Sequence, residues 1–249
     1  MVIGLVVWCW RVTKKGDWAR YSAFLAAALL ANEALLGAAL VLSKHVGNDR
    51  SAGRLPFLCL HFGNTLLLLA TLSLTANWLS TDSRRFTLIR KWRQVSSIGL
   101  GLLAMMVTGI SGAVAALADT LFPSNSLAAS VAQDFSSATP ALLSVRLLHP
   151  AVATVAACCV LCVVWRSSTG LNRLSRSAIT LIILLFMQVG IGIANVLLLA
   201  PVWVQITHLF VADALWILVV LASADLVLEP AVACPAWDLA SFVTEGRRR

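Results

Sequence analysis

Three histidines stand in or beside long apolar segments of this sequence, where polar side chains are scarce. They are His61, His149 and His208, whereas His45 lies between two such segments. An imidazole nitrogen can ligate a metal or a haem iron, or it can make a hydrogen bond to a neighbouring helix. A histidine inside a membrane is a candidate functional residue. The helices that carry these three side chains would decide which of these roles they have.

The composition indicates a membrane protein. Of the 249 residues, 59% are hydrophobic and only 12% are charged, and the mean hydropathy is +0.88. Soluble domains carry about 25% charged residues. The net charge of +8 does not indicate a nucleic-acid partner, because the basic residues fall in short clusters between apolar segments. That pattern is typical of membrane topology, and membrane lipid is the expected surrounding.

Six apolar segments are long enough to cross a membrane, which takes about 20 helical residues. Strand-like alternation is absent from the sequence pattern, so the predicted class is an all-α integral membrane protein. The predicted spans are roughly 21–43, 57–79, 95–117, 140–165, 176–198 and 202–228.

Positive charge predicts the orientation of these spans. Of the 19 Lys and Arg residues, 15 lie in the stretches 11–20, 80–94, 166–176 and 247–249. Connections rich in Lys and Arg stay in the cytoplasm. We therefore expect a cytoplasmic C-terminus, in a bacterial cytoplasmic membrane, with the three histidines near the outer ends of their spans.

An internal repeat relates the two parts of the chain. Residues 6–43 align with 161–198 without a gap, and 10 of the 38 aligned positions are identical. In this register Glu33 pairs with Gln188 and Gly37 with Gly192. The repeat predicts two pseudo-repeated four-helix bundles, with an incomplete N-terminal half and a complete C-terminal half.

The expected division of the chain is 1–79 and 80–249. Residues 1–10 are apolar, but ten helical residues reach only about 15 Å, half the thickness of the hydrocarbon core. We interpret them as the inner half of a helix whose outer half precedes Met1. The first half then holds two full spans and a partial one.

The complete half places His149 and His208 on its second and fourth helices at similar depth. Two imidazoles arranged in this way suit a haem iron with two axial nitrogen ligands, although interhelical hydrogen bonds are the alternative. Arg146 lies one turn outside His149. Its guanidinium suits haem propionates, or it extends to the interface without a ligand.

Other polar residues in the spans have less specific interpretations. Glu33 would make an interhelical hydrogen bond, as its counterpart Gln188 would, or it would handle protons. Asp213 has no partner that the sequence identifies. Cys158, Cys159 and Cys162 share one span, where buried packing residues are the simpler interpretation and a metal site the alternative.

The sequence also resembles the haem A synthases of cytochrome oxidase assembly. The resemblance covers most of the chain and follows the order and the histidine placement of that family. The matching strings are "NEALLGAALVL" (32–42), "LHFGNTLLLLATLSLTANW" (60–78), "SGAVAALADTLFP" (111–123), "RLLHPAVA" (146–153) and "QVGIGIANVLLLAPVWVQITHLFVADALW" (188–216).

The resemblance implies an eight-helix fold and a function. The C-terminal half would bind haem b through His149 and His208. The N-terminal half would receive haem O as substrate, with His61 at its iron, and would oxidise a ring methyl to the formyl group of haem A. The family's second substrate-site histidine, and a glutamate one turn before it, would precede Met1.

The resemblance also implies partners, namely the enzyme that makes haem O and other oxidase assembly factors; a homo-oligomer is compatible with the sequence. Two other functions remain open. One is a haem b-binding electron carrier or assembly factor without methyl oxidation. The other is a transporter or structural bundle, which would bind no chromophore.

Overall fold

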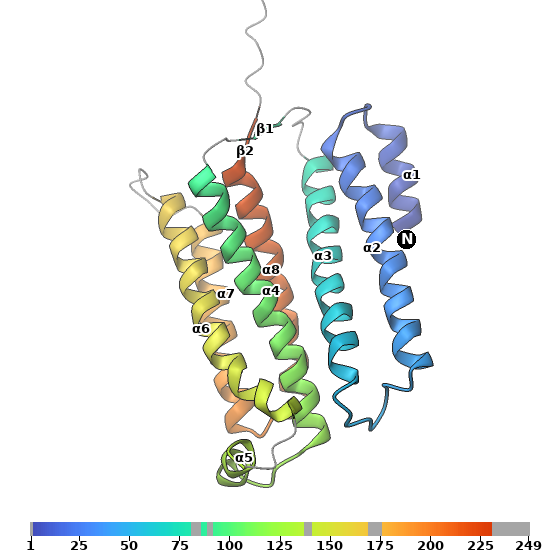
Figure 1. The fold of residues 1–249 in the computed structure, drawn as a ribbon. Helices are drawn as coiled ribbons and strands as arrows, with labels where there is room; N and C mark the ends of the chain where they lie inside the picture. The colour runs from blue at the N-terminus through green and yellow to red at the C-terminus, as the bar shows by residue number, and fades with distance from the viewer. Residues whose placement is uncertain (1, 81–85, 89–91, 137–140, 169–175, 231–249) are drawn as a thin grey trace, which may run out of the picture.

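The computed structural model describes residues 2–80, 86–88, 92–136, 141–168 and 176–230. This part of the chain is predominantly helical (Figure 1). The helices are α1 (Val2–Val12), α2 (Trp18–Leu42), α3 (Arg54–Ser80), α4 (Trp92–Leu121), α5 (Leu127–Asp134), α6 (Ala141–Ser168), α7 (Arg176–Leu197) and α8 (Val202–Val227).

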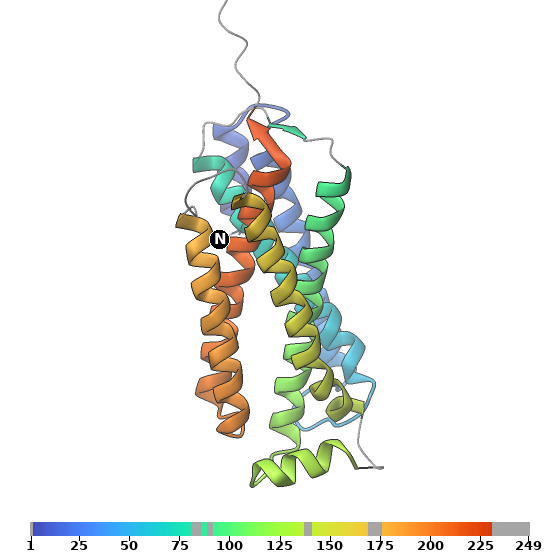
Figure 2. The ribbon, with the colours of Figure 1, turned by 90° about the vertical axis from the view of Figure 1, so that its left-hand side faces the viewer.

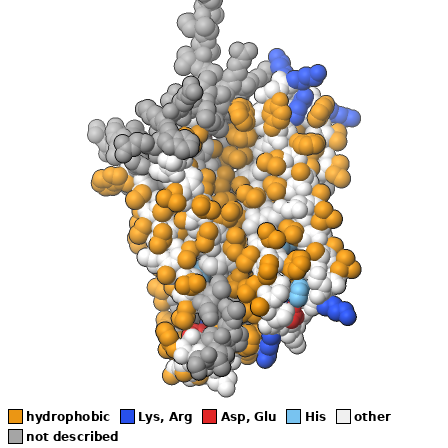
Figure 3. Space-filling model, in the orientation of Figure 1, with side chains coloured by type: hydrophobic (Ala, Val, Ile, Leu, Met, Phe, Trp, Pro, Cys, Tyr) orange, Lys and Arg blue, Asp and Glu red, His pale blue; other side chains and the backbone are white. Residues whose placement is uncertain are grey.

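Five of these helices are long and apolar enough to span a membrane, which confirms the prediction of an integral membrane protein. They are α2, α3, α7, α8 and the segment Val95–Leu121 of α4. Figure 3 shows hydrophobic side chains along the middle of one face and Lys and Arg side chains at its two ends. The predicted sixth span falls on α6, where the apolar stretch among the described residues is Arg146–Cys162, so this span stays a prediction.

The long helices form antiparallel pairs, α2 with α3, α4 with α6, and α7 with α8. Helix α3 joins the N-terminal helices to the others, because it contacts both α4 and α8. A buried cluster of Leu66, Trp216 and Val220 lies at this junction. The indole N–H of Trp216 donates a hydrogen bond of 2.8 Å to the carbonyl of Leu66, which fixes the two helices in register.

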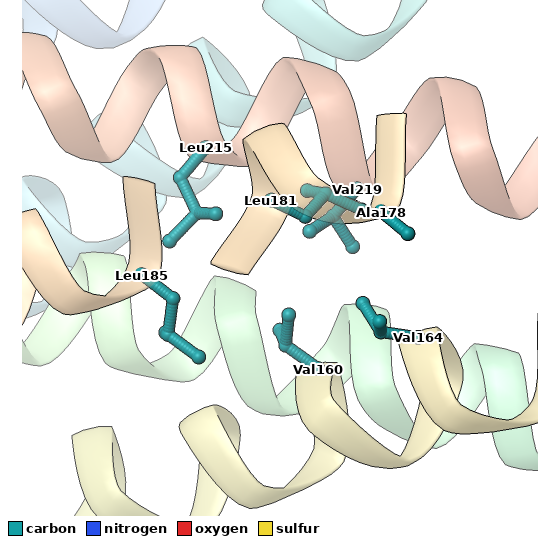
Figure 4. Close-up of a cluster of buried hydrophobic side chains, with 7 residues drawn as sticks. All are labelled: Val160, Val164, Ala178, Leu181, Leu185, Leu215 and Val219. Carbon is teal, nitrogen blue, oxygen red and sulfur yellow. The ribbon is translucent and has the colours of Figure 1, made fainter. Parts of the chain in front are cut away.

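A second buried cluster closes one end of the C-terminal helices. Val160 and Val164 of α6 meet Ala178, Leu181 and Leu185 of α7 and Leu215 and Val219 of α8 (Figure 4). These positions recur every three or four residues, as expected for packed helix faces. Figure 2 shows that the pairs α4–α6 and α7–α8 diverge toward the opposite end, which carries the α7–α8 turn.

Two features depart from the predicted pattern of long helices. Residues Phe86–Leu88 and Leu228–Pro230 form short strands, β1 and β2, that pair antiparallel. The connection after α4 contains α5, which lies across the end of the bundle (Figure 2). The Ser126 hydroxyl accepts a bond of 3.2 Å from the Ala129 N–H and so caps this helix.

Candidate histidine site in the C-terminal helices

His149 lies on α6 and packs against the neighbouring helix α4. Its Nδ1 is 3.0 Å from the hydroxyl oxygen of Ser111. The ring also presses on the backbone at Gly112, where an added methyl group would lie 3.0 Å from the ring Cε1. Only a residue without a side chain allows this approach, so Ser111 and Gly112 together set the position of the imidazole.

His208 lies on α8 and repeats this arrangement against α7. An added methyl group at Gly192 would lie 3.1 Å from the His208 Cε1. One turn along α7, the side-chain amide nitrogen of Gln188 is 3.3 Å from the His208 Nε2. A glycine and a polar side chain on a neighbouring helix therefore contact each imidazole.

The fold brings the two histidine-bearing helices together. Helix α6, which carries His149, contacts α8, which carries His208. The buried cluster of Figure 4 lies further along the same helices, so apolar packing fills one end of the bundle and the histidines occupy the other.

Several polar atoms on α7 and α8 are buried without a hydrogen-bond partner among the described residues. They include the His208 Nδ1, the Gln188 Oε1 and the Asn195 Oδ1. A buried polar atom without a partner costs about 1–3 kcal/mol, and native proteins usually avoid this cost. The unpartnered His208 Nδ1, with the glycine that admits its ring, fits an imidazole that binds a ligand.

Arg146 lies one turn before His149, as predicted, and the structure supplies partners that the sequence did not indicate. Its Nη1 donates a 2.8 Å bond to Asp119 of α4, and its Nε donates a 3.0 Å bond to Asp134 of α5. The side chain of Arg146 is 12% exposed and that of Asp134 is 10% exposed. Arg146 therefore ties α5 to the end of the bundle.

His61 lies on α3 and faces α2. Its Nδ1 is 3.4 Å from the Glu33 Oε1, and an added methyl group at Gly37 would lie 3.9 Å from its Cε1. Glu33 also accepts hydrogen bonds from the Asn64 amide and the Thr65 hydroxyl. The interhelical hydrogen bond expected for Glu33 is present, with partners on α3.

The remaining candidates lie apart from these histidines. His45 bonds Asp49 in the α2–α3 connection at 2.7 Å. Asp213 makes no hydrogen bond or ion pair with any residue in the described ranges. Cys158 and Cys162 are exposed on the helix surface, so the expectation that they are buried is wrong for these two. Within the described ranges, no cluster of three His, Cys, Asp or Glu residues could hold a metal ion.

The fold and these contacts define a polytopic membrane protein with histidines oriented inside its helix bundle. The chain belongs to the cytochrome oxidase assembly protein family, the family of haem A synthases, which matches residues 1–220. The resemblance in the sequence is thereby confirmed.

Two curated relatives match most of the chain. They are proteins from two strains of Thermus thermophilus, both named "Protoheme IX farnesyltransferase". Each is 36% identical over 228 residues, which is 88% of this chain and 36% of the relative. The chain thus spans about a third of the length of these relatives. No solved structure matches it significantly.

Proposed function

We propose that this chain is a haem A synthase-type membrane oxidoreductase, which converts a methyl group of haem O to the formyl group of haem A for cytochrome oxidase. The family supports a role in oxidase assembly. The observation that carries the proposal is the repeated contact of an intramembrane histidine with a glycine, at His149 on Gly112 and at His208 on Gly192.

In this proposal His149 and His208 would hold the iron of a resident haem b. The bound haem would supply electron transfer. Ser111 orients the His149 ring through its Nδ1. Gln188 contacts the Nε2 of His208, so an iron on that nitrogen would displace the amide. The glycines set the separation between each ring and its neighbouring helix. The surrounding apolar helices exclude water, which favours the neutral imidazoles that ligate iron.

Arg146 is proposed to contribute to the propionate end of this site. Its position one turn from His149 suits that role. Two of its donors already contact Asp119 and Asp134, so a propionate would share the guanidinium with these carboxylates or displace them.

His61 is proposed as the contact to the iron of haem O, on the N-terminal side of the α3 junction. The division into an N-terminal substrate side (1–79) and a C-terminal haem b side (80–249) belongs to the same proposal. So does the orientation with a cytoplasmic C-terminus.

The name of the Thermus relatives, "Protoheme IX farnesyltransferase", suggests which enzyme this chain would work with. About two thirds of each relative lies outside the match, so the name does not say which part transfers the farnesyl group. A protein that carries both a segment like this chain and a farnesyltransferase name supports the proposal that this chain works beside an enzyme producing haem O.

A second function is a haem b-binding electron carrier without methyl oxidation. The observation that favours it is the pair of oriented histidines in the C-terminal helices, His149 and His208. Such a carrier would need the C-terminal site alone.

Haem analysis separates the two functions. The chain would be produced in membranes that also contain a haem O-producing farnesyltransferase but no other haem A synthase, and the extracted haems would be separated by chromatography. The proposal expects haem A, which is lost in His61→Ala and kept in His45→Ala. Bound haem b without any haem A would favour the electron carrier.

A further inference from the structure

The two parts of the predicted repeat differ in the residue that faces the histidine. Glu33 and Gln188 occupy corresponding positions, each one turn before the glycine that contacts the ring. Glu33 lies beside His61 and Gln188 beside His208. The N-terminal histidine therefore faces a carboxylate, whereas the C-terminal histidine faces a neutral amide.

The Glu33 carboxylate is held in place by donors from α3. The Asn64 amide bonds Oε2, and the Thr65 hydroxyl bonds Oε1. The same Asn64 amide donates a second bond of 2.9 Å to the Leu29 carbonyl, and its own oxygen accepts a 2.8 Å bond from Asn32. Glu33 is 18% exposed, so these donors offset part of the cost of placing a carboxylate among apolar helices.

The Glu33 Oε1 still has one acceptor position available. A carboxylate oxygen accepts two hydrogen bonds, and Oε1 is bonded by Thr65 and lies 3.4 Å from the His61 Nδ1. That Nδ1 is buried and has no hydrogen-bond partner among the described residues. A small rotation of the imidazole would bring donor and acceptor together, within the space left by Gly37.

We propose that Glu33 is the positioning residue of His61: it accepts the Nδ1–H and leaves Nε2 free to bind a ligand such as a haem iron. Its role toward iron rests on the function proposed above. The hydrogen bond itself is a property of the chain alone.

The difference between Glu33 and Gln188 gives the two sites different chemistry. A carboxylate that accepts the N–H of a ligating histidine raises the basicity of that ligand and fixes its tautomer. Stronger donation to iron stabilises its oxidised form. The Gln188 amide gives no such support, because its nitrogen lies 3.3 Å from the Nε2 of His208 and its oxygen accepts no bond from the His208 Nδ1. An iron bound at His61 would therefore have a lower reduction potential than one bound at His208.

The test is nitrogen NMR of the haem-free full chain in detergent micelles, with ¹⁵N-labelled histidine. The His61 signals would be assigned by their loss in His61→Asn. We expect the Nδ1–H tautomer at His61 in the native chain. Glu33→Leu should convert it to the Nε2–H tautomer, whereas Gln188→Leu, the matched change beside His208, should leave the His61 signals unchanged.

A second variant covers the case in which Glu33→Leu does not fold. Glu33→Gln keeps an oxygen acceptor, so it should keep the Nδ1–H tautomer but move the Nδ1 proton resonance upfield, because a neutral acceptor makes a weaker bond. An Nε2–H tautomer in the native chain, or an Nδ1 resonance unmoved in Glu33→Gln, would overturn the proposal.

This result is independent of haem binding. A chain that binds no haem but shows the Glu33-dependent tautomer would remove the proposed function and leave the hydrogen bond standing. A chain that binds haem but shows no such dependence would remove only the role of Glu33.

Discussion

The glycines against the histidine rings provide the sharpest prediction. A methyl group added at Gly112 or Gly192 would lie 3.0 or 3.1 Å from the Cε1 of His149 or His208. The best separation between carbon atoms is about 3.5–4.0 Å, so each ring would have to move by about half an ångström. Gly112→Ala and Gly192→Ala should therefore displace the imidazoles without removing them.

Two opposing effects set the magnitude. Overpacking a closely packed site costs about 1–3 kcal/mol, whereas replacing a helical glycine by alanine gains up to about 1 kcal/mol. With the full gain from alanine, the net loss should be between about 0 and 2 kcal/mol. If a loss in the upper part of this range falls on the arrangement that binds haem, the affinity should fall roughly tenfold, since each 1.4 kcal/mol corresponds to a factor of ten.

The same helices supply matched controls. At Gly99 of α4 and Gly190 of α7, an added methyl group would have no heavy atom within 4 Å. Gly99→Ala and Gly190→Ala should therefore keep haem binding and leave the thermal stability unchanged or raised. The assay is haem titration of each purified variant, followed by its visible absorbance.

The contrast between the two pairs of variants decides the outcome. Equal haem affinity in Gly192→Ala and Gly190→Ala would refute the reasoning, because the ring contact would then have no role in binding. At Gly37 the added methyl would lie at an ordinary contact distance of 3.9 Å from His61, so Gly37→Ala should be tolerated.

Four further predictions concern the surrounding structure. Arg146→Gln should lower the free energy of unfolding by about 1–3 kcal/mol, because Asp119 loses a charged donor and α5 loses the bond from Arg146 to Asp134. Faster proteolysis within α5 would show it. Trp216→Phe should cost about 1–2 kcal/mol in detergent unfolding, from one lost hydrogen bond and a smaller ring. Ala200 has a positive φ of 56°, which is strained for a residue with a side chain. Ala200→Gly relieves this strain and adds flexibility to the unfolded chain. The melting temperature of the protein should therefore not fall. A hydrogen bond with His45 lowers the pKa of Asp49 to about 2. The contribution of Asp49 to stability is therefore present above its ordinary pKa and is lost as the pH falls toward 2. A carboxyl-carbon NMR titration, with Asp49→Asn as the control, would follow this change.

Apolar length and charge clustering predicted most of the fold. A membrane span must be helical because exposing backbone polar groups to lipid is costly, and this cost applies to every residue of the segment. The predicted ranges therefore agree to within a few residues with α2, α3, α4, α7 and α8. Helix α5 was missed because eight residues carry too little periodicity to separate a short helix from a connection. The strands β1 and β2 are three residues each and depend on pairing between distant parts of the chain.

The sequence predicted only those parts of the candidate site that lie within single apolar segments. A histidine in an apolar segment is visible in the sequence, and so is the correspondence of Gly37 with Gly192. The partners of Arg146 were not visible, because they lie 27 and 12 residues away. Asp119 meets Arg146 through the packing of α4 against α6, and Asp134 meets it through the path of α5. The contact of Ser111 with His149 likewise depends on how α4 packs against α6.

The central claim is that His149 and His208 hold a haem iron. The most direct measurement is the reduced-minus-oxidised visible spectrum of the chain purified in mild detergent, with pyridine extraction to identify the haem. The account predicts about one haem b per chain, with two axial nitrogen ligands, lost in His149→Ala and in His208→Ala and kept in His45→Ala. A folded, helical and colourless protein, or a spectrum unchanged in both membrane histidine variants, would contradict the account.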